Sequence, residues 1–210
     1  MNLWGRLFAA GYDRAMAGAE QAVLRDHRER LIDRATGSVL EVGGGTGANL
    51  PFYRAAVEEL VITEPEAPMA RRLERRLAGD APRSRLVRAP AEELPFAGQS
   101  FDFVVSTLVL CTVDDPALAL AEIHRILRPG GSLIFLEHVR SEEPKLARWQ
   151  DRLHGPWVRF GHGCHCNRPT LDGIERAGFS IEELVHDRFR GAPAIVRPLI
   201  AGVALASGPF

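Results

Sequence analysis

Short apolar runs alternate with longer amphipathic segments over most of the chain. Runs that are typical of buried strands lie at residues 39–42, 60–63, 84–88, 101–106 and 132–136. In the segments between several of these runs, apolar side chains recur at helical spacing, as Met69, Leu73 and Leu77 do. This alternation favours a parallel sheet that is covered by helices on both faces.

The predicted helices begin and end at residues that commonly cap them. Residues 1–35 are rich in Ala, Arg and Glu, and their helical pattern stops at Thr36-Gly37. A short helix is predicted over residues 49–57, with Pro51 near its start, and another helix starts at Asp115-Pro116. We expect one domain over residues 1–210, with a helical lid at 1–35 and an α/β core at 36–210.

Bulk composition narrows the range of functions. The net charge of −1 gives no electrostatic footprint for nucleic acid, so no nucleic-acid partner is expected. An odd number of cysteines without a secretory signal favours reduced thiols and a cytoplasmic location. The strong preference for arginine over lysine points to a GC-rich, bacterial genome. The apolar stretch at residues 199–206 is too short to span a bilayer, so no stable membrane insertion is expected.

A glycine-rich loop follows the first predicted strand. Gly43, Gly45 and Gly47 remove side chains where a ligand approaches the backbone, and Glu41 adds a carboxylate that suits a ligand ammonium group. S-adenosylmethionine carries both a carboxylate and an amino group at one end and fits this loop. A dinucleotide fits more loosely, and a turn without a ligand is the third reading. A phosphate-binding loop of the Gly-Lys-Ser/Thr type is excluded because the loop has no lysine.

Other polar residues follow the remaining strands. In open α/β sheets, ligands bind beyond the carboxyl ends of the strands, where Glu64 and His138 are expected. Glu64 suits the ribose hydroxyls of an adenosine, although a surface acid is the alternative. Met69 either lies against the adenine or packs in the core.

A loop of alternating His and Cys residues lies at positions 162–166. Metal sites usually draw their ligands from two separated pairs, so four ligands on five residues fit a tetrahedral site poorly. A loop that faces a substrate is the favoured reading, and no metal is expected.

Several of these motifs in combination resemble the class I S-adenosylmethionine-dependent methyltransferases over residues 36–185. They are Glu41-Val-Gly-Gly-Gly-Thr-Gly, Glu64-Pro65, Ala91-Glu92-Glu93-Leu-Pro-Phe, Ser100-Phe-Asp, Leu127-Arg-Pro-Gly-Gly and Ile174-Glu-Arg-Ala-Gly-Phe. The resemblance implies a Rossmann-like, mostly parallel seven-stranded sheet and S-adenosylmethionine as the cofactor. The candidate cofactor-binding residues are Glu41, Gly43, Gly45, Gly47, Asn49, Glu64, Pro65, Met69, Ala91, Glu92, Thr107 and Leu108.

Within that superfamily, three further segments are similar to the animal alkyl-thiol S-methyltransferases of the methyltransferase-like group. They are Thr107-Leu-Val-Leu-Cys-Thr-Val113, Leu136-Glu-His-Val139 and the loop at Gly163-Cys164. The resemblance implies methyl transfer to a small-molecule thiol, such as a lipophilic thiol or a reduced dithiol natural product. The animal proteins also carry an N-terminal membrane anchor, and we do not expect a membrane location to carry over.

One departure from the family pattern and two alternative functions stay open at this point. Pro90 stands where many relatives carry Asp, so adenine recognition is expected to rest more on the backbone. A C- or O-methyltransferase of a quinone or polyketide is the alternative enzyme, and a ligand-sensing or zinc-binding accessory protein is the alternative without turnover.

The acceptor site is expected beneath the N-terminal lid. His138 and His165 are candidate catalytic bases, because imidazole titrates near neutral pH. The candidate acceptor-binding residues are Tyr12, Cys111, Trp157, His162 and Cys164.

Overall fold

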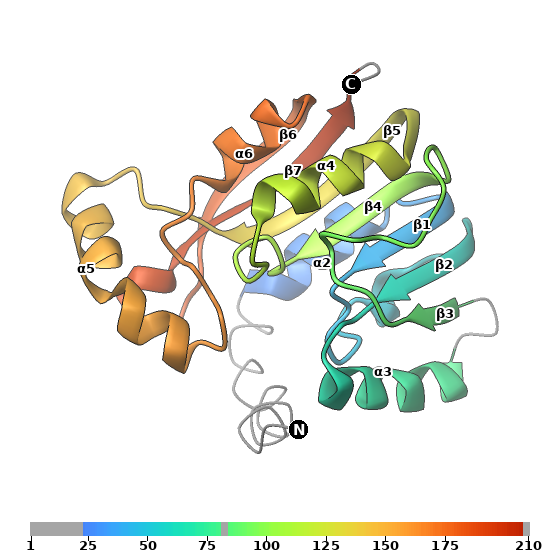
Figure 1. Ribbon diagram of the computed structural model, residues 1–210, viewed down its shortest axis with the longest axis horizontal. Coiled ribbons are helices and arrows are strands. Elements are labelled where there is room, and N and C mark those ends of the chain that lie inside the picture. The colour runs from blue at the N-terminus through green and yellow to red at the C-terminus, as the bar shows by residue number, and fades with distance from the viewer. Residues whose placement is uncertain (1–22, 81–83, 208–210) are drawn as a thin grey trace.

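A seven-stranded sheet forms the centre of the molecule in the computed structural model, which describes residues 23–80 and 84–207 (Figure 1). The strands lie in the order β3-β2-β1-β4-β5-β7-β6. They are β1 (Gly37–Val42), β2 (Val57–Thr63), β3 (Ser84–Val87), β4 (Phe101–Thr107), β5 (Leu127–His138), β6 (Phe179–Arg188) and β7 (Pro198–Ala206). This confirms the predicted seven-stranded, mostly parallel sheet.

The first five strands are parallel, and the last two form an antiparallel edge. β7 pairs antiparallel with β5 on one side and with β6 on the other. The apolar stretch at residues 199–206 therefore fills an interior position of the sheet, which explains why its side chains are almost all buried.

Helices cover both faces of this sheet. They are α2 (Arg25–Ile32), α3 (Ala67–Asp80), α4 (Pro116–Ile126), α5 (Pro144–Phe160) and α6 (Thr170–Arg176), with short 3₁₀ helices η2 (Leu50–Phe52) and η3 (Ala194–Val196). In Figure 1, α4 and α6 lie in front of the strands and α2 lies behind them. Leu120 and Ile174 pack in one apolar core on the front face, whereas Leu31 and Leu73 belong to the core on the other face.

The predicted helix over residues 49–57 is wrong in extent. Only η2 is helical there, Tyr53 is already extended, and β2 begins at Val57. Pro51 fits the first turn of a helix, but the residues that follow must return the chain to pair Val57 with Gly37 of β1. The segment is too short to form both a longer helix and this connection.

The N-terminal helical prediction is confirmed only where the structure describes it. α2 packs its Leu31 and Ile32 side chains into the core, so it is part of the packed layer. The part of the predicted lid at residues 1–22, including Tyr12, lies outside the described residues. Among residues 23–80 and 84–207, no helix is both long and apolar enough to cross a membrane.

Candidate active site

The loop after β1 lies where β1, β2 and β4 end. Gly43, Gly45 and Gly47 all have positive φ angles, of 59°, 56° and 87°. Residues other than glycine rarely adopt this left-handed backbone conformation. A Cβ atom at Gly43 would lie 2.7 Å from Val109, whereas one at Gly45 would have nothing within 4 Å. Gly45 is therefore the position at which the bare backbone faces open space and admits a ligand.

Glu64 is fixed against this loop. The Gly45 N–H donates to Glu64 Oε2 at 2.8 Å, and the Glu66 N–H donates to Oε1 at 2.8 Å. Burial raises the pKa of the Glu64 carboxyl. Because each carboxylate oxygen has a second lone pair, the group can still accept hydrogen bonds from ligand hydroxyls.

The side chain of Glu41 is buried. Its Oε2 accepts a hydrogen bond from Tyr53 Oη at 2.8 Å, and its Oε1 accepts one from Asn49 Nδ2 at 3.0 Å. Burial raises the pKa of the Glu41 carboxyl from its ordinary value to about 7. Glu41 thus fastens the end of the glycine loop through two neighbouring side chains.

Arg28 of α2 joins the same network and was missed in the sequence. Its Nη1 donates to Asn49 Oδ1 and, at 3.1 Å, to Thr107 Oγ1, which also accepts a hydrogen bond from Asn49 Nδ2 at 3.0 Å. The side chain is buried, so a positive charge lies between the ends of β1 and β4. The one feature of the sequence that could have indicated this role is that Arg28 is a basic residue within the apolar face of the α2 segment.

The loops after β3 and β4 are joined by Glu92. Its Oε1 accepts hydrogen bonds from the Asp114 and Asp115 N–H groups at 2.8 and 3.2 Å. Ala91 beside it is buried, as is Met69 on α3. The structure thus brings the predicted adenine-side residues to the same edge of the sheet as the glycine loop.

Glu137 organises the loop after β4, and sequence reasoning gave it no role. Its Oε1 accepts hydrogen bonds from Ser106 Oγ and from the Val109 and Leu110 N–H groups, at 2.8, 3.0 and 3.1 Å. Its Oε2 accepts one from the Cys111 N–H at 3.3 Å. Burial raises the pKa of this carboxyl, although these hydrogen bonds oppose the rise. A lone acid inside the apolar run of β5 was the signal for such a role.

The loop after β4 contains a residue with a strained backbone conformation, Leu108. Leu108 has a φ of 60°, which is uncommon for a residue with a branched side chain. Its N–H donates to the Leu136 carbonyl at 2.8 Å, so the neighbouring strand holds it in place. Such strain clusters at functional sites.

The predicted acceptor residues gather around two cysteines. The Cys111 and Cys164 thiols share a hydrogen bond, which raises the pKa of Cys111 and lowers that of Cys164. The His165 N–H donates to the Cys111 carbonyl at 2.7 Å, and the Trp157 side chain lies beside Cys164. Cys111, Cys164, His165 and Trp157 therefore come together from three separate parts of the chain.

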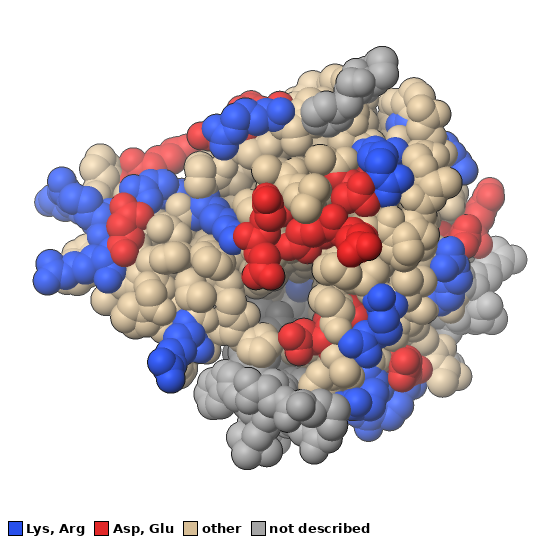
Figure 2. All heavy atoms as spheres, in the orientation of Figure 1, with Lys and Arg blue, Asp and Glu red and all other residues tan. Residues whose placement is uncertain are grey.

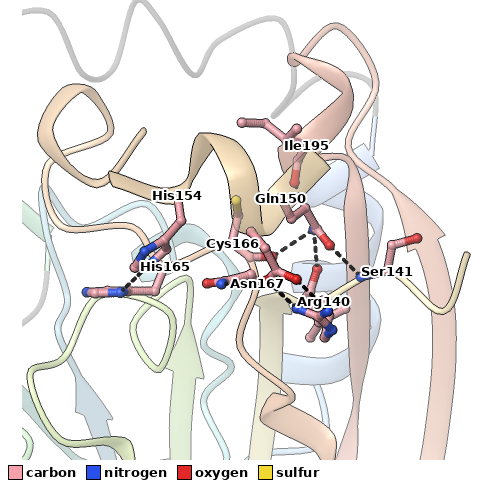
Figure 3. A network of polar contacts seen from close by, with 10 residues as sticks. Arg140, Ser141, Gln150, His154, His165, Cys166, Asn167 and Ile195 are labelled. Atoms are coloured by element: carbon pink, nitrogen blue, oxygen red, sulfur yellow. Dashed lines mark hydrogen bonds and ion pairs between the residues drawn. The ribbon is translucent and has the colours of Figure 1, made fainter. Parts of the chain in front are cut away.

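The two candidate bases have different surroundings. His165 Nδ1 lies 2.8 Å from His154 Nε2, as Figure 3 shows. Burial lowers the pKa of His165, and Arg168 lowers it further. His138 is buried at the end of β5, with its ring centroid 5.0 Å from that of Phe189. Burial lowers the pKa of His138 to about 4, so its imidazole is neutral at physiological pH.

The loop at residues 162–166 does not form a metal centre on its own. Within the described part of the chain, no three His, Cys, Asp or Glu side chains are grouped to hold a metal ion. His162 has a φ of 50°, and the Gly163 N–H donates to the Val158 carbonyl at 2.9 Å, so the loop folds back on α5.

Comparison with known proteins agrees with this geometry. The family described as "Methyltransferase domain" matches residues 40–135. The chain is 34% identical to thiol S-methyltransferase TMT1A of Homo sapiens, over 94% of this chain and 82% of the human protein. It is 38% identical to thiol S-methyltransferase TMT1B of Rattus norvegicus, over 70% of this chain but only 62% of the rat protein.

A solved structure supports the same assignment. The S-adenosylmethionine-dependent methyltransferase of Thermotoga maritima superposes with a TM-score of 0.69 at 25% identity, and the match covers 96% of this chain and 98% of that one. The sheet order, the glycine loop and these similarities agree, and they imply S-adenosylmethionine as the cofactor. The chain belongs to the class I S-adenosylmethionine-dependent methyltransferases.

Proposed function

We propose that this protein transfers a methyl group from S-adenosylmethionine to the sulfur of a small, lipophilic thiol. The observation that carries the proposal is the similarity to thiol S-methyltransferase TMT1A of Homo sapiens over 94% of the chain. The cluster of Cys111, Cys164 and Trp157 supports it, because an apolar, sulfur-rich wall suits a soft, apolar acceptor better than a highly charged one.

We assign the donor to the glycine loop. The open space at Gly45, between Gly43 and Gly47, supports this assignment, and Glu64 and Pro65 follow the next strand beside it. We assign the ribose hydroxyls to the Glu64 carboxylate, because its oxygens are oriented by two backbone N–H groups and retain lone pairs. When bound, the donor supplies a methyl group that its positively charged sulfur already activates.

The polar network between α2, β1 and β4 receives the amino-acid end of the donor in this proposal. Arg28 offers positive charge for the carboxylate, and Glu41 lies behind Asn49 to balance it. Thr107 accepts hydrogen bonds from both Arg28 and Asn49, which orients the network. Ala91 and Glu92 are assigned to the adenine, with Met69 and Leu108 as apolar contacts.

On the acceptor side, the residues have two tasks. The buried Cys111 and Cys164 and the Trp157 ring exclude water, and a thiol must lose its proton to become a good nucleophile. We assign the proton to His165 Nε2, because Nδ1 is engaged with His154 and the lowered pKa keeps the ring neutral. His138 is the second candidate, and burial lowers its pKa to about 4, which makes it a weak base at neutral pH. His162 is assigned to the rim of the acceptor site.

The decisive experiment is an acceptor panel. The purified protein is supplied with labelled S-adenosylmethionine and with lipophilic thiols, reduced dithiols, glutathione, phenols and quinols at equal concentrations. We expect kcat/KM to be highest for a lipophilic thiol, at least about tenfold above glutathione. A preference for a phenol, or a methylated carbon in the product, would instead establish the O- or C-methyltransferase alternative.

A further inference from the structure

The outer face of α5 exposes large apolar side chains. Trp149 is 53% exposed, Leu153 37% and Phe160 69%, whereas Leu118 on α4 is the one other large apolar residue this exposed among the described residues. Positions 149, 153, 156 and 160 recur at spacings of four and three, so these residues and the exposed Pro156 share one face of the helix. The result is a continuous apolar stripe along α5.

The stripe is not needed to hold α5 in place. A different face of the helix does this through Gln150, whose side chain is fully buried. Gln150 Nε2 lies 3.0, 2.8 and 2.9 Å from the carbonyls of Val139, Cys166 and Ile195, and its Oε1 accepts the Ser141 N–H at 2.8 Å (Figure 3). Exposed apolar area on a helix that is already fastened marks an interaction surface.

Basic residues border the stripe on the same helix. The exposed side chains of Lys145, Arg148, Arg152 and Arg159 follow one flank, and the Arg152 guanidinium lies 5.7 Å from the centre of the Trp149 ring. The one acid of the helix, Asp151, is bound by Arg140. In Figure 2, several basic side chains lie around the part of the molecule that α5 forms, with some acidic ones among them, and the largest group of acidic side chains lies near the centre of the view.

We propose that α5 docks on the surface of an anionic lipid bilayer, with its apolar stripe at the boundary of headgroups and acyl chains. Trp, Phe and Leu on one face beside a row of Arg and Lys are the composition of helices that lie in this interface. Four bases and an internal proline exclude a spanning helix of this length. A protein partner is disfavoured because the exposed charged side chains within α5 that border the stripe are basic, and the one acid of the helix, Asp151, is paired with Arg140.

The proposal concerns where the protein binds and does not rest on the identity of the acceptor. It does have a consequence for access, because the same helix carries Trp157 beside Cys164. An acceptor dissolved in the bilayer would meet the protein at the helix that forms a wall of the proposed acceptor site.

The test is co-sedimentation of the full-length protein with vesicles. Vesicles of phosphatidylcholine with roughly one third phosphatidylglycerol are compared with pure phosphatidylcholine at low and high salt. We expect binding to the anionic vesicles that weakens with salt. The double substitution Trp149→Ser with Phe160→Ser should reduce the partition coefficient at least about tenfold, and Arg148→Gln with Arg159→Gln should remove the preference for anionic lipid.

Leu118→Ser is the matched control, because it removes an equally exposed apolar side chain from α4. It should leave vesicle binding unchanged, and circular dichroism should give the same helix content for all variants. Two results would overturn the proposal: no salt-sensitive binding of the wild-type protein, or equal binding by the Trp149/Phe160 variant. Self-association in solution that the same double substitution abolishes, without vesicle binding, would make the stripe a protein interface and also overturn it.

Discussion

Gly43, Gly45 and Gly47, the three alternating glycines of the loop after β1, differ in how much room the surrounding protein leaves for a side chain. Packing against Val109 demands glycine at position 43, and packing against Leu50 and Leu73 demands it at position 47. At Gly45 none of the described residues lies within 4 Å of the position that a Cβ atom would take. Of the three positions, this is the one where internal packing among the described residues does not require glycine, which fits the proposed role in donor binding.

Gly45→Val should abolish measurable binding of S-adenosylmethionine while the protein stays folded. The new side chain would fill the open space, and the positive φ adds strain of roughly 1–2 kcal/mol. Calorimetric titration measures the loss. Gly130→Val is the matched control, since Gly130 has a φ of 76° with nothing within 4 Å but lies at the opposite end of β5. Equal loss of binding in both variants would show that strain alone is responsible.

Glu41 should make stability depend on pH. Its pKa of about 7 in the folded protein lies above the ordinary value of 4.5, so protonation favours the folded state. This contribution is fully present below pH 4.5 and is lost as the pH rises through about 7. Between about pH 5 and pH 8 the wild-type protein should lose about 2–3 kcal/mol of unfolding free energy relative to Glu41→Gln.

Urea denaturation of both proteins across this range measures the effect, and only the difference between them is attributed to Glu41. Parallel curves for the two proteins would show that the buried carboxyl titrates normally.

A functional residue can be predicted from the sequence when its role depends on neighbouring positions in the chain. It is missed when the role depends on partners that are distant in the chain. Glu64 directly follows a strand, and the glycines have a recognisable spacing, so both were predicted at the correct edge of the sheet. Arg28 acts only because α2 packs beneath β1 and β4, and Glu137 acts only because β4 and β5 are neighbours. A charged residue within an apolar segment was the local signal in both cases, but it does not identify the partners, which are 79 and 27 residues away in the chain.

At the scale of elements, β5 holds the loop after β4 through one carboxylate. Glu137→Gln would place an amide N–H₂ where backbone N–H groups now donate, so at least one buried N–H loses its acceptor. We expect a loss of about 2–3 kcal/mol in unfolding free energy. Denaturant unfolding measures it.

The control for Glu137 is Glu59→Gln, which breaks an exposed ion pair with Arg85 on β2 and β3. Because the pair is solvent-exposed, this change should cost less than about 1 kcal/mol. If the two substitutions cost the same, the loop does not depend on Glu137.

The elements themselves were predicted well where their apolar period is long. The predicted starts of β4 and α4 were found, and Asp115 caps α4 by accepting the Ala117 and Leu118 N–H groups at 2.9 and 3.1 Å. The segment at residues 49–57 misled the prediction because short apolar stretches suit helix and strand alike. No helix or strand was predicted for the apolar stretch at 199–206, and its pairing with β5 and β6 defines it as β7.

At the scale of the whole molecule, α2 ties distant parts of the sheet to the donor site. Arg28 reaches the ends of β1 and β4, and His27 Nε2 lies 2.8 Å from Asp187 Oδ2 on β6. The proposed donor site thus involves packed elements of the core in addition to the glycine loop. Ligand binding there should stabilise the folded state as a whole.

S-adenosylhomocysteine should therefore raise the thermal midpoint of the protein. At a concentration about a hundredfold above Kd, a ligand that binds only the folded state adds about 2.7 kcal/mol, or roughly 5–10 °C for a chain of this size. Arg28→Gln removes the charge proposed for the donor's carboxylate, so the ligand-induced shift should shrink by at least half. Arg34→Gln is the control, because among the described residues Arg34 forms ion pairs with the exposed Glu182 and Glu183 of β6. Scanning calorimetry of the three proteins with and without ligand makes the comparison, and an undiminished shift in Arg28→Gln would place the donor's carboxylate elsewhere.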